Sequence, residues 1–191
     1  MQFHPTDLKG VYRIELEPHF DKRGFFARTF CRQEFAEHGL EGHIEQCNLV
    51  RNQVQGTLRG IHYHVAPLGE IKIVQCVRGA VYDVLVDLRP ASSTYGRWVA
   101  FELREDRPEM LYVPKGMGHG YQTLESETYL TYFHSERAHP DAEKGITWNH
   151  PGLGIPWPLP HPILSDRDRS HPHFELQRDS GHTISQLGSD V

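Results

Sequence analysis

The chain has 191 residues, of which 38% are hydrophobic and 24% charged, and its formal net charge is −5 at pH 7. This length and composition suffice for one substantial core, so we expect a single domain over residues 1–175 and a polar, poorly ordered tail over residues 176–191. The mixed charges argue against a nucleic-acid partner. No segment has the apolar run of a leader or a membrane span, so we expect a cytoplasmic protein.

Cys31, Cys47 and Cys76 are widely spaced, and no two of them form a Cys-x-x-Cys pair. An odd number of separated cysteines is typical neither of a disulfide framework nor of a zinc-thiolate site. We therefore expect free thiols in a reducing compartment.

A short helix is expected first along the chain, over Gln33–His38, with Gly39 as its left-handed cap. Short runs rich in Val, Ile, Tyr and Trp then recur between turn signals, and such runs are typical of strands. The expected strands are Gly60–His64, Ile71–Val77, Ala80–Leu88, Arg97–Leu103, Met110–Val113 and Thr128–His134.

Turn residues separate these strands at Arg78-Gly79, at Pro90–Gly96 and at Arg107-Pro108. The segment Asn149–Pro162 contains five prolines, so we expect it to wrap irregularly over a sheet. Many short strands between such turns predict an all-β antiparallel sandwich or barrel.

Two histidines lie close together on the first of these strands. Alternation places His62 and His64 on one face, and Arg59 on the other unless Gly60 introduces a bulge. The sequence alone leaves the face of Arg59 open.

Two later strands add a lysine and a tyrosine. Lys72 shares its face with apolar residues, an unusual setting for an ammonium group unless it is paired or functional. Tyr132 occupies a comparable position on the last strand. A barrel that gathers a histidine, a lysine and a tyrosine holds an acid–base set, although each residue alone is more often an ordinary core residue.

Eight short motifs occur in a fixed order along the chain: Asp21–Phe26, Gln46–Asn48, Leu58–Tyr63, Lys72, Val86–Arg89, Pro114–Gly120, Glu143–Asn149 and Leu164–Asp168. In this order the chain resembles the dTDP-4-dehydrorhamnose 3,5-epimerase family over about residues 5–175. The resemblance implies a double-stranded β-helix, or cupin-like jelly roll, with a few short helices. It also implies an isomerase that acts on a nucleotide-linked 4-keto-6-deoxyhexose and uses neither a cofactor nor a metal.

The resemblance assigns a chemical role to four residues. The C4 ketone of such a sugar acidifies the hydrogens at C3 and C5, so a base can remove one and leave an enolate. His62 would be the base, and Asp168 would orient its ring and stabilise the imidazolium. Lys72 would stabilise the enolate oxygen, and Tyr132 would return a proton from the opposite face.

The resemblance also implies a larger set of substrate contacts, in which arginines suit the pyrophosphate because their planar donors grip its oxygens in pairs. These residues are Arg23, Gln46, Cys47, Asn48, Arg59, Lys72, His119, Glu143 and Arg167.

Two departures from the family fall on nucleobase recognition. Arg28 stands where the family has a glutamate, and Ala138 stands where it has a tyrosine that stacks on thymine. The resemblance therefore leaves open a CDP-linked or other nucleotide sugar, and inversion at one centre instead of two.

His64 stands where the family usually has glutamine, which raises a second possibility. Metal-binding cupins present His-x-His, a glutamate and a later histidine, and this order occurs as His62, His64, Glu70 and His119. This metal-dependent alternative leaves the lysine, tyrosine and aspartate unexplained, whereas the epimerase interpretation uses them.

A third possibility is a non-catalytic cupin that binds sugar nucleotides, because fold alone does not fix activity. The complete set of base, orienting acid, lysine and tyrosine favours the enzyme. We expect a homodimer that shares an N-terminal strand, as the resemblance implies, with a small-molecule substrate, no nucleic acid and no membrane partner.

Overall fold

The computed structural model describes residues 1–65 and 69–173, and within them the chain forms mainly antiparallel β-sheet. One sheet has six strands, in the order β1 (Gln2–Pro5), β2 (Tyr12–Glu15), β10 (Glu109–Val113), β7 (Lys72–Arg78), β12 (Thr128–His134) and β5 (Gln46–Asn52). The other has five, in the order β13 (Glu143–Gly145), β6 (Leu58–His64), β11 (Met117–Thr123), β8 (Ala80–Asp87) and β9 (Trp98–Arg104).

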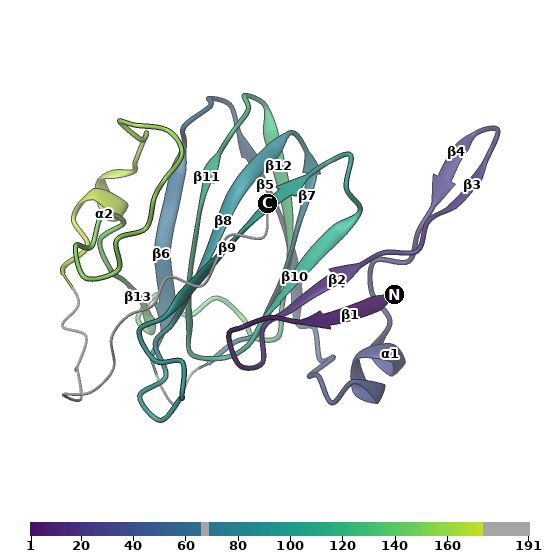
Figure 1. Cartoon of the computed structure of the whole chain (residues 1–191), viewed down its shortest axis with the longest axis horizontal. Helices are drawn as coiled ribbons and strands as arrows, with labels where there is room; N and C mark the ends of the chain where they lie inside the picture. The colour runs from purple at the N-terminus through teal and green to yellow at the C-terminus, as the bar shows by residue number, and fades with distance from the viewer. Residues whose placement is uncertain (66–68, 174–191) are drawn as a thin grey trace.

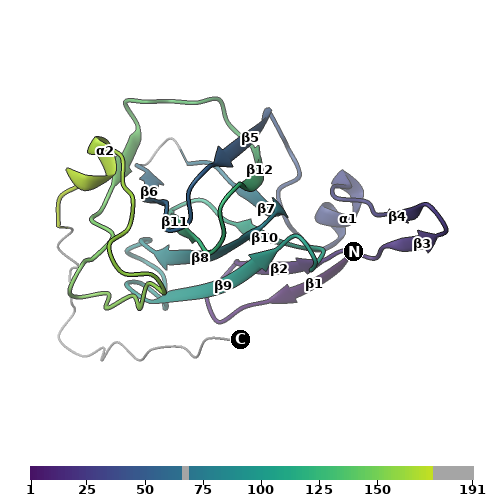
Figure 2. The ribbon, with the colours of Figure 1, turned by 90° about the horizontal axis from the view of Figure 1, so that it is seen from above.

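Seen from above, the two sheets enclose a common interior (Figure 2). This architecture confirms the expected all-β jelly roll of cupin type. A separate hairpin of β3 (His19–Asp21) and β4 (Gly24–Phe26) projects beyond the sandwich (Figure 1).

The interior is apolar because alternate residues of each strand point between the sheets. Val74 of β7, Leu85 of β8 and Leu130 of β12 are fully buried in this cluster. Tyr121 and Tyr132 belong to the same cluster, so the interior also contains two hydroxyl groups.

Each outer face is covered by a segment with its own apolar side chains. Helix α1 (Arg32–Glu37) places Phe35 against the six-stranded sheet. Leu153 and Trp157 pack against the five-stranded sheet, where the Trp98 indole N–H donates to the Leu153 carbonyl at 2.8 Å. The irregular segment expected over residues 149–162 therefore does wrap over a sheet.

The predicted strands correspond to β6–β10 and β12 within two residues at each end, and β12 has the predicted bounds. The predicted helix is confirmed with a shift of one residue, and Gly39 has the left-handed φ of +69°. The predicted strands omitted β5 and β11, and also β1 to β4 and β13. The proposed domain boundary at residue 175 and the tail lie outside the described residues and stay predictions.

Gly60 introduces the bulge that the sequence left open. Opposite β11, His62 pairs with His119 whereas Arg59 pairs with Tyr121, so β6 carries one extra residue between these pairs. A Cβ on Gly60 would lie 2.5 Å from the Gly120 Cα, and its φ is +123°. Only glycine fits this close approach without displacement of the neighbouring strand.

No helix in the described part of the chain is long and apolar enough to cross a membrane.

Candidate active site

His62 and Asp168 form a close pair although 106 positions separate them. His62 Nε2 lies 2.5 Å from Asp168 Oδ1, and the two side chains are 24% and 6% exposed. A largely buried carboxylate that contacts one imidazole nitrogen fixes the orientation of the ring and stabilises its protonated form. The structure thus assembles the predicted base and its predicted orienting acid.

Helix α2 (Asp166–Arg169) holds Asp168 in place. The Ser165 hydroxyl caps this helix by accepting from the Asp168 N–H, and it also donates to Asp168 Oδ2 at 2.8 Å. Burial alone would raise the pKa of Asp168, but the hydrogen bond and charge of His62 outweigh it and lower the pKa. The carboxyl group is therefore ionised at neutral pH.

Glu143 and Arg167 flank the same histidine. Glu143 Oε1 lies 3.8 Å from His62 Nδ1, and the Arg167 guanidinium donates to Glu143 Oε2 at 3.2 Å. The structure therefore brings two predicted substrate contacts to the base. His171 also lies against this pair, with its ring centroid 5.5 Å from that of His62, and burial together with the charge of His62 lowers the pKa of His171.

Tyr132 faces the interior from the opposite sheet. Its ring centroid lies 6.0 Å from that of His119, the residue that pairs with His62 across β6 and β11. Burial raises the pKa of Tyr132 well above its usual value, and nearby Tyr121 and Asp83 raise it further. The phenol is therefore protonated at neutral pH and able to donate.

Two buried polar groups support this region. His119 Nε2 lies 2.9 Å from Asp83 Oδ2, and both side chains are almost fully buried. On β5 of the other sheet, Asn52 Oδ1 accepts from Arg59 Nε at 2.9 Å and from the Tyr121 hydroxyl at 3.2 Å. Arg59 thereby lies against interior residues, as the bulge at position 60 allows.

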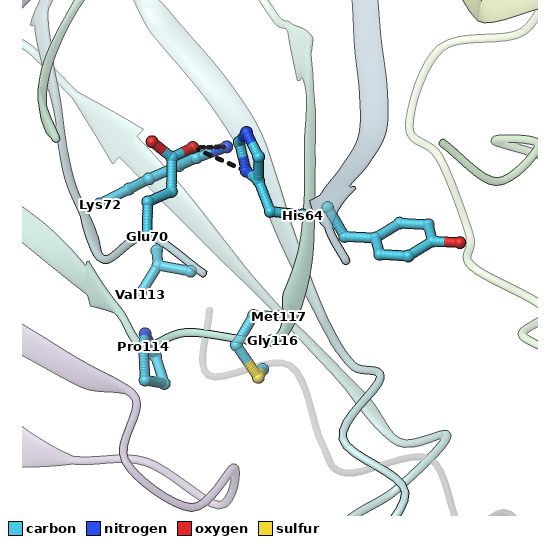
Figure 3. Close-up of a pocket in the computed structure, with 8 residues that line it drawn as sticks. His64, Glu70, Lys72, Val113, Pro114, Gly116 and Met117 are labelled. Carbon is cyan, nitrogen blue, oxygen red and sulfur yellow. Dashed lines mark ion pairs between the residues drawn. The ribbon is translucent and has the colours of Figure 1, made fainter. Parts of the chain in front are cut away.

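Lys72 lies in a cluster around Glu70 (Figure 3). Glu70 Oε1 contacts Lys72 Nζ and His64 Nδ1, both at 3.1 Å, and Oε2 contacts His134 Nδ1 at 3.0 Å. Burial alone would raise the pKa of Glu70, but hydrogen bonds from the two histidines and the Lys72 charge outweigh burial and lower it strongly. The carboxylate holds the lysine at a small pocket that also includes Met117.

Strand β5 presents only part of its predicted motif to the interior. Asn48 pairs with Tyr132 and Gln46 pairs with His134 on β12, on the face of the inward residues. Cys47 lies between them, exposed and on the opposite face. The assignment of Cys47 as a substrate contact stays a prediction, and its side chain lies on the face opposite to Gln46 and Asn48.

Three other predicted residues lie away from these groups. Arg23 occupies the projecting hairpin, where it is 83% exposed and pairs with Asp21 (Figure 1). Arg28 donates to Glu34 of α1 at 2.7 Å. Ala138 is exposed in the loop after β12. Within this single chain, none of the three contacts the interior groups.

The structure does not assemble the alternative metal set. Each of its three histidines contacts a different carboxylate: His62 contacts Asp168, His64 contacts Glu70, and His119 contacts Asp83. Converging side chains of one site would share a single centre. The positions of these side chains therefore do not support a metal-dependent cupin with these four ligands.

The sequence interpretation missed three polar residues of the interior, namely Asn52, Asp83 and Tyr121. Asp83 did carry a signal, because it interrupts an otherwise apolar strand and a buried carboxylate needs a partner. Alternation already places His134 on the face of Tyr132, but the sequence interpretation gave it no role, and its contact with Glu70 comes only from the fold.

Comparisons with known proteins match most of the chain. The family model for dTDP-4-dehydrorhamnose 3,5-epimerase matches residues 5–175. The dTDP-4-dehydrorhamnose 3,5-epimerase of Methanothermobacter thermautotrophicus is 39% identical over 173 residues, which are 88% of this chain and 92% of the relative. The dTDP-4-dehydrorhamnose 3-epimerase of Streptomyces niveus is 38% identical over 182 residues, covering 95% and 87%.

A solved structure agrees with these sequence matches. The dTDP-4-dehydrorhamnose 3,5-epimerase of Bacillus anthracis, solved with TDP and pyrophosphate bound, superimposes with a TM-score of 0.88 and 35% identity. The match covers 91% of this chain and 99% of that one.

Proposed function

The chain belongs to the dTDP-4-dehydrorhamnose 3,5-epimerase family and is an epimerase of the isomerase class; from that premise we propose that it inverts C3, C5 or both in a nucleotide-diphosphate-linked 4-keto-6-deoxyhexose. The substrate of first choice is dTDP-4-dehydro-6-deoxyglucose, because relatives that share more than a third of their residues with this chain are named for dTDP sugars.

His62 removes the proton next to the C4 ketone in the proposed reaction. The observation that carries this role is the 2.5 Å contact between His62 Nε2 and Asp168 Oδ1. An imidazole held by a buried carboxylate accepts a proton readily, because the carboxylate stabilises the resulting cation. With the other ring nitrogen near Glu143, the ring has limited freedom to turn.

Lys72 stabilises the enolate oxygen that forms at C4. Its side chain is 14% exposed and its ammonium group is held by Glu70, so the charge stays near the interior instead of extending into solvent. A preorganised cation in a poorly solvated site stabilises developing negative charge more strongly than it would in water.

Tyr132 returns a proton on the face opposite to His62. It comes from the opposite sheet and its raised pKa keeps it protonated, which suits a general acid. Inversion then depends on the sugar lying between the histidine and the tyrosine.

A second candidate differs only in substrate. Ala138 and Arg28 replace the family's stacking tyrosine and glutamate, and these positions concern the nucleobase. A CDP-linked 4-keto sugar is therefore the alternative substrate. A reaction confined to one centre has precedent in the name of the Streptomyces niveus relative, which is a 3-epimerase.

We also propose a homodimer in which the β3–β4 hairpin reaches the partner. Phe20, Phe25 and Phe26 are 75%, 62% and 72% exposed on this projecting hairpin, and exposed aromatic side chains of this size favour an interface. Arg23, at the tip of the hairpin, would then serve the active site of the other subunit.

Incubation in heavy water with dTDP-4-dehydro-6-deoxyglucose, and separately with its CDP counterpart, tests the proposed function. We expect deuterium at C3 or C5 and an inverted product from one nucleotide series, and NMR of the product identifies the centre. Absence of both label and inversion with every nucleotide sugar tested would contradict the proposal. Equal rates with both nucleotide sugars would contradict discrimination between the two nucleobases.

A further inference from the structure

A second imidazole, that of His171, lies beside the His62–Asp168 pair but has no part in the proposed chemistry. His171 Nε2 lies 3.4 Å from Asp168 Oδ1, the same oxygen that faces His62 Nε2. The His171 side chain is 9% exposed, and its Nε2 atom is buried and makes no hydrogen bond to any residue within 1–65 and 69–173. A buried nitrogen of this kind requires a physical explanation.

Three atoms that could bind a metal ion converge at this point. All of them, one each from His62, Asp168 and His171, lie within 4.8 Å of one another, and no other group of three or more His, Cys, Asp or Glu in the described chain converges in this way. Zinc bonds of about 2.0–2.2 Å in a tetrahedral site place ligand atoms about 3.3 Å apart. Small side-chain rotations would bring the three atoms to that spacing.

The backbone around His171 is fixed by contacts outside the catalytic pair. The Thr147 N–H donates to the Pro172 carbonyl at 3.0 Å, which ties the segment after α2 to the segment after β13. The His171 ring occupies the space above Gly145, where an added Cβ would overlap the imidazole. The ring therefore has a defined place beside Asp168.

We infer that His62, Asp168 and His171 form a binding site for a divalent transition-metal ion of the Zn²⁺ class, with the remaining position open to water. Two imidazoles and one carboxylate are a donor set that zinc and neighbouring metals accept. The site differs from the cupin set considered from the sequence, since it uses neither His64 nor Glu70. The Lys72 ammonium at Glu70 disfavours a cation there.

Occupation of this site would withdraw the base from catalysis, because a cation bound at His62 Nε2 lowers the proton affinity of Nδ1, the nitrogen that is free to accept the substrate proton. The site would then make the enzyme sensitive to inhibition by zinc. This consequence depends on the proposed function, whereas metal binding itself does not.

Titration of the tag-free, EDTA-treated full chain with Co²⁺ tests the binding. We expect one Co²⁺ per chain with visible d–d absorption, and its displacement by Zn²⁺. His171→Ala should weaken this binding by at least ~100-fold, because even the loss of an outer-shell partner costs 10–100-fold in metal affinity. His173→Ala, two positions further in the same segment, and His64→Gln, in the Glu70 cluster, should both retain it.

Unchanged binding in His171→Ala, or loss of binding in His64→Gln, would overturn the assigned ligands. Circular dichroism of each variant separates loss of a ligand from loss of the fold. Zinc should also slow deuterium exchange in the parent enzyme reversibly with EDTA, and should affect His171→Ala less, each protein measured against its own metal-free rate. Stoichiometric binding without inhibition would leave the metal site in place and contradict His62 as the base.

Discussion

At the scale of single residues, the interior separates groups that accept protons from groups that donate them. His62 lies against an ionised carboxylate, and Tyr132 is kept protonated by burial. These opposite environments are what an inversion needs, because one face must lose a proton and the other must supply one.

Tyr132→Phe should impair inversion more than exchange. Removal of the hydroxyl eliminates the proton donor, so the inverted product should form about 10²–10⁴-fold more slowly. Exchange needs only the base face and should persist. The measurement is the ratio of inverted product to deuterium incorporated in the recovered substrate. An equal loss of both would argue against a separate acid role for Tyr132.

Glu70→Gln should lower kcat with little change in KM. The neutral amide no longer holds the Lys72 ammonium, and misplacement of an oriented group by about 1 Å can cost up to ~100-fold. Glu37→Gln, an exposed change on α1, is the matched control. If Glu70→Gln has the parental kcat although the enzyme still needs the Lys72 ammonium group for activity, then other contacts position Lys72.

At the scale of elements, β8 combines catalytic support with structural support. Asp83 in its middle contacts His119 of the site. Asp87 at its end accepts from Ser92 and Thr94, both at 2.6 Å, and from the Arg89 guanidinium. The second carboxylate therefore organises the loop from β8 to β9.

Asp87→Asn should lower the free energy of unfolding at pH 7 by about 3 kcal/mol, since a fully buried charge that pairs with Arg89 is lost. Burial alone would raise the pKa of Asp87, but the hydrogen bonds from Arg89, Ser92 and Thr94 lower it. The stabilisation is thus present above the unfolded-state pKa of about 3.9 and is lost as the pH falls through the lower folded-state value.

Denaturant unfolding from pH 7 to pH 3 measures this effect. The variant should show a shallower loss of stability toward low pH than the parent. Parallel pH profiles for the two proteins would assign the acid sensitivity to other groups, such as Glu70 or Asp168.

Sequence patterns predicted the strands whose residues have a high intrinsic preference for β-structure. β12 is rich in threonine and aromatic residues and was predicted with its bounds, whereas β11 contains Gly118 and Gly120, which weaken any strand pattern. The glycines are explained only by tertiary packing: a Cβ on Gly118 would lie 2.8 Å from the Ile61 side chain. Local propensity could not reveal that contact.

Most of the site was predicted from the family resemblance, because local sequence patterns do not show which distant residues meet in the fold. Asp168 came only from the family motif, since no local pattern links it to a histidine 106 positions away. His171 had no family role, and only the fold brings it to Asp168. Cys47 was included because the motif is contiguous, although strand alternation places its side chain on the face opposite to Gln46 and Asn48.

At the scale of the whole molecule, one predicted substrate contact, Arg23, lies far from the active site of its own chain. Arg23 lies on a hairpin that projects away from the sandwich, beside three exposed phenylalanines (Figure 1). A symmetric dimer would place each hairpin against the partner.

Mixing of two inactive variants tests this arrangement. Arg23→Ala and His62→Ala should each be defective alone, but a heterodimer would contain one site with both native residues. After subunit exchange, activity should return to about one quarter of the parent level, because half of the dimers are mixed and each has one intact site. Light scattering should give twice the chain mass of 22.0 kDa. Dimers without recovery would place Arg23 outside the partner's site.

The most direct test of the central claim, that the His62–Asp168 pair abstracts the substrate proton, is deuterium exchange by His62→Ala alongside measurement of its affinity for dTDP. We predict that exchange falls by at least ~10²–10⁴-fold while dTDP affinity is largely kept, because the base is removed and the nucleotide contacts remain. Exchange at the parental rate in a variant that still binds dTDP would contradict His62 as the base.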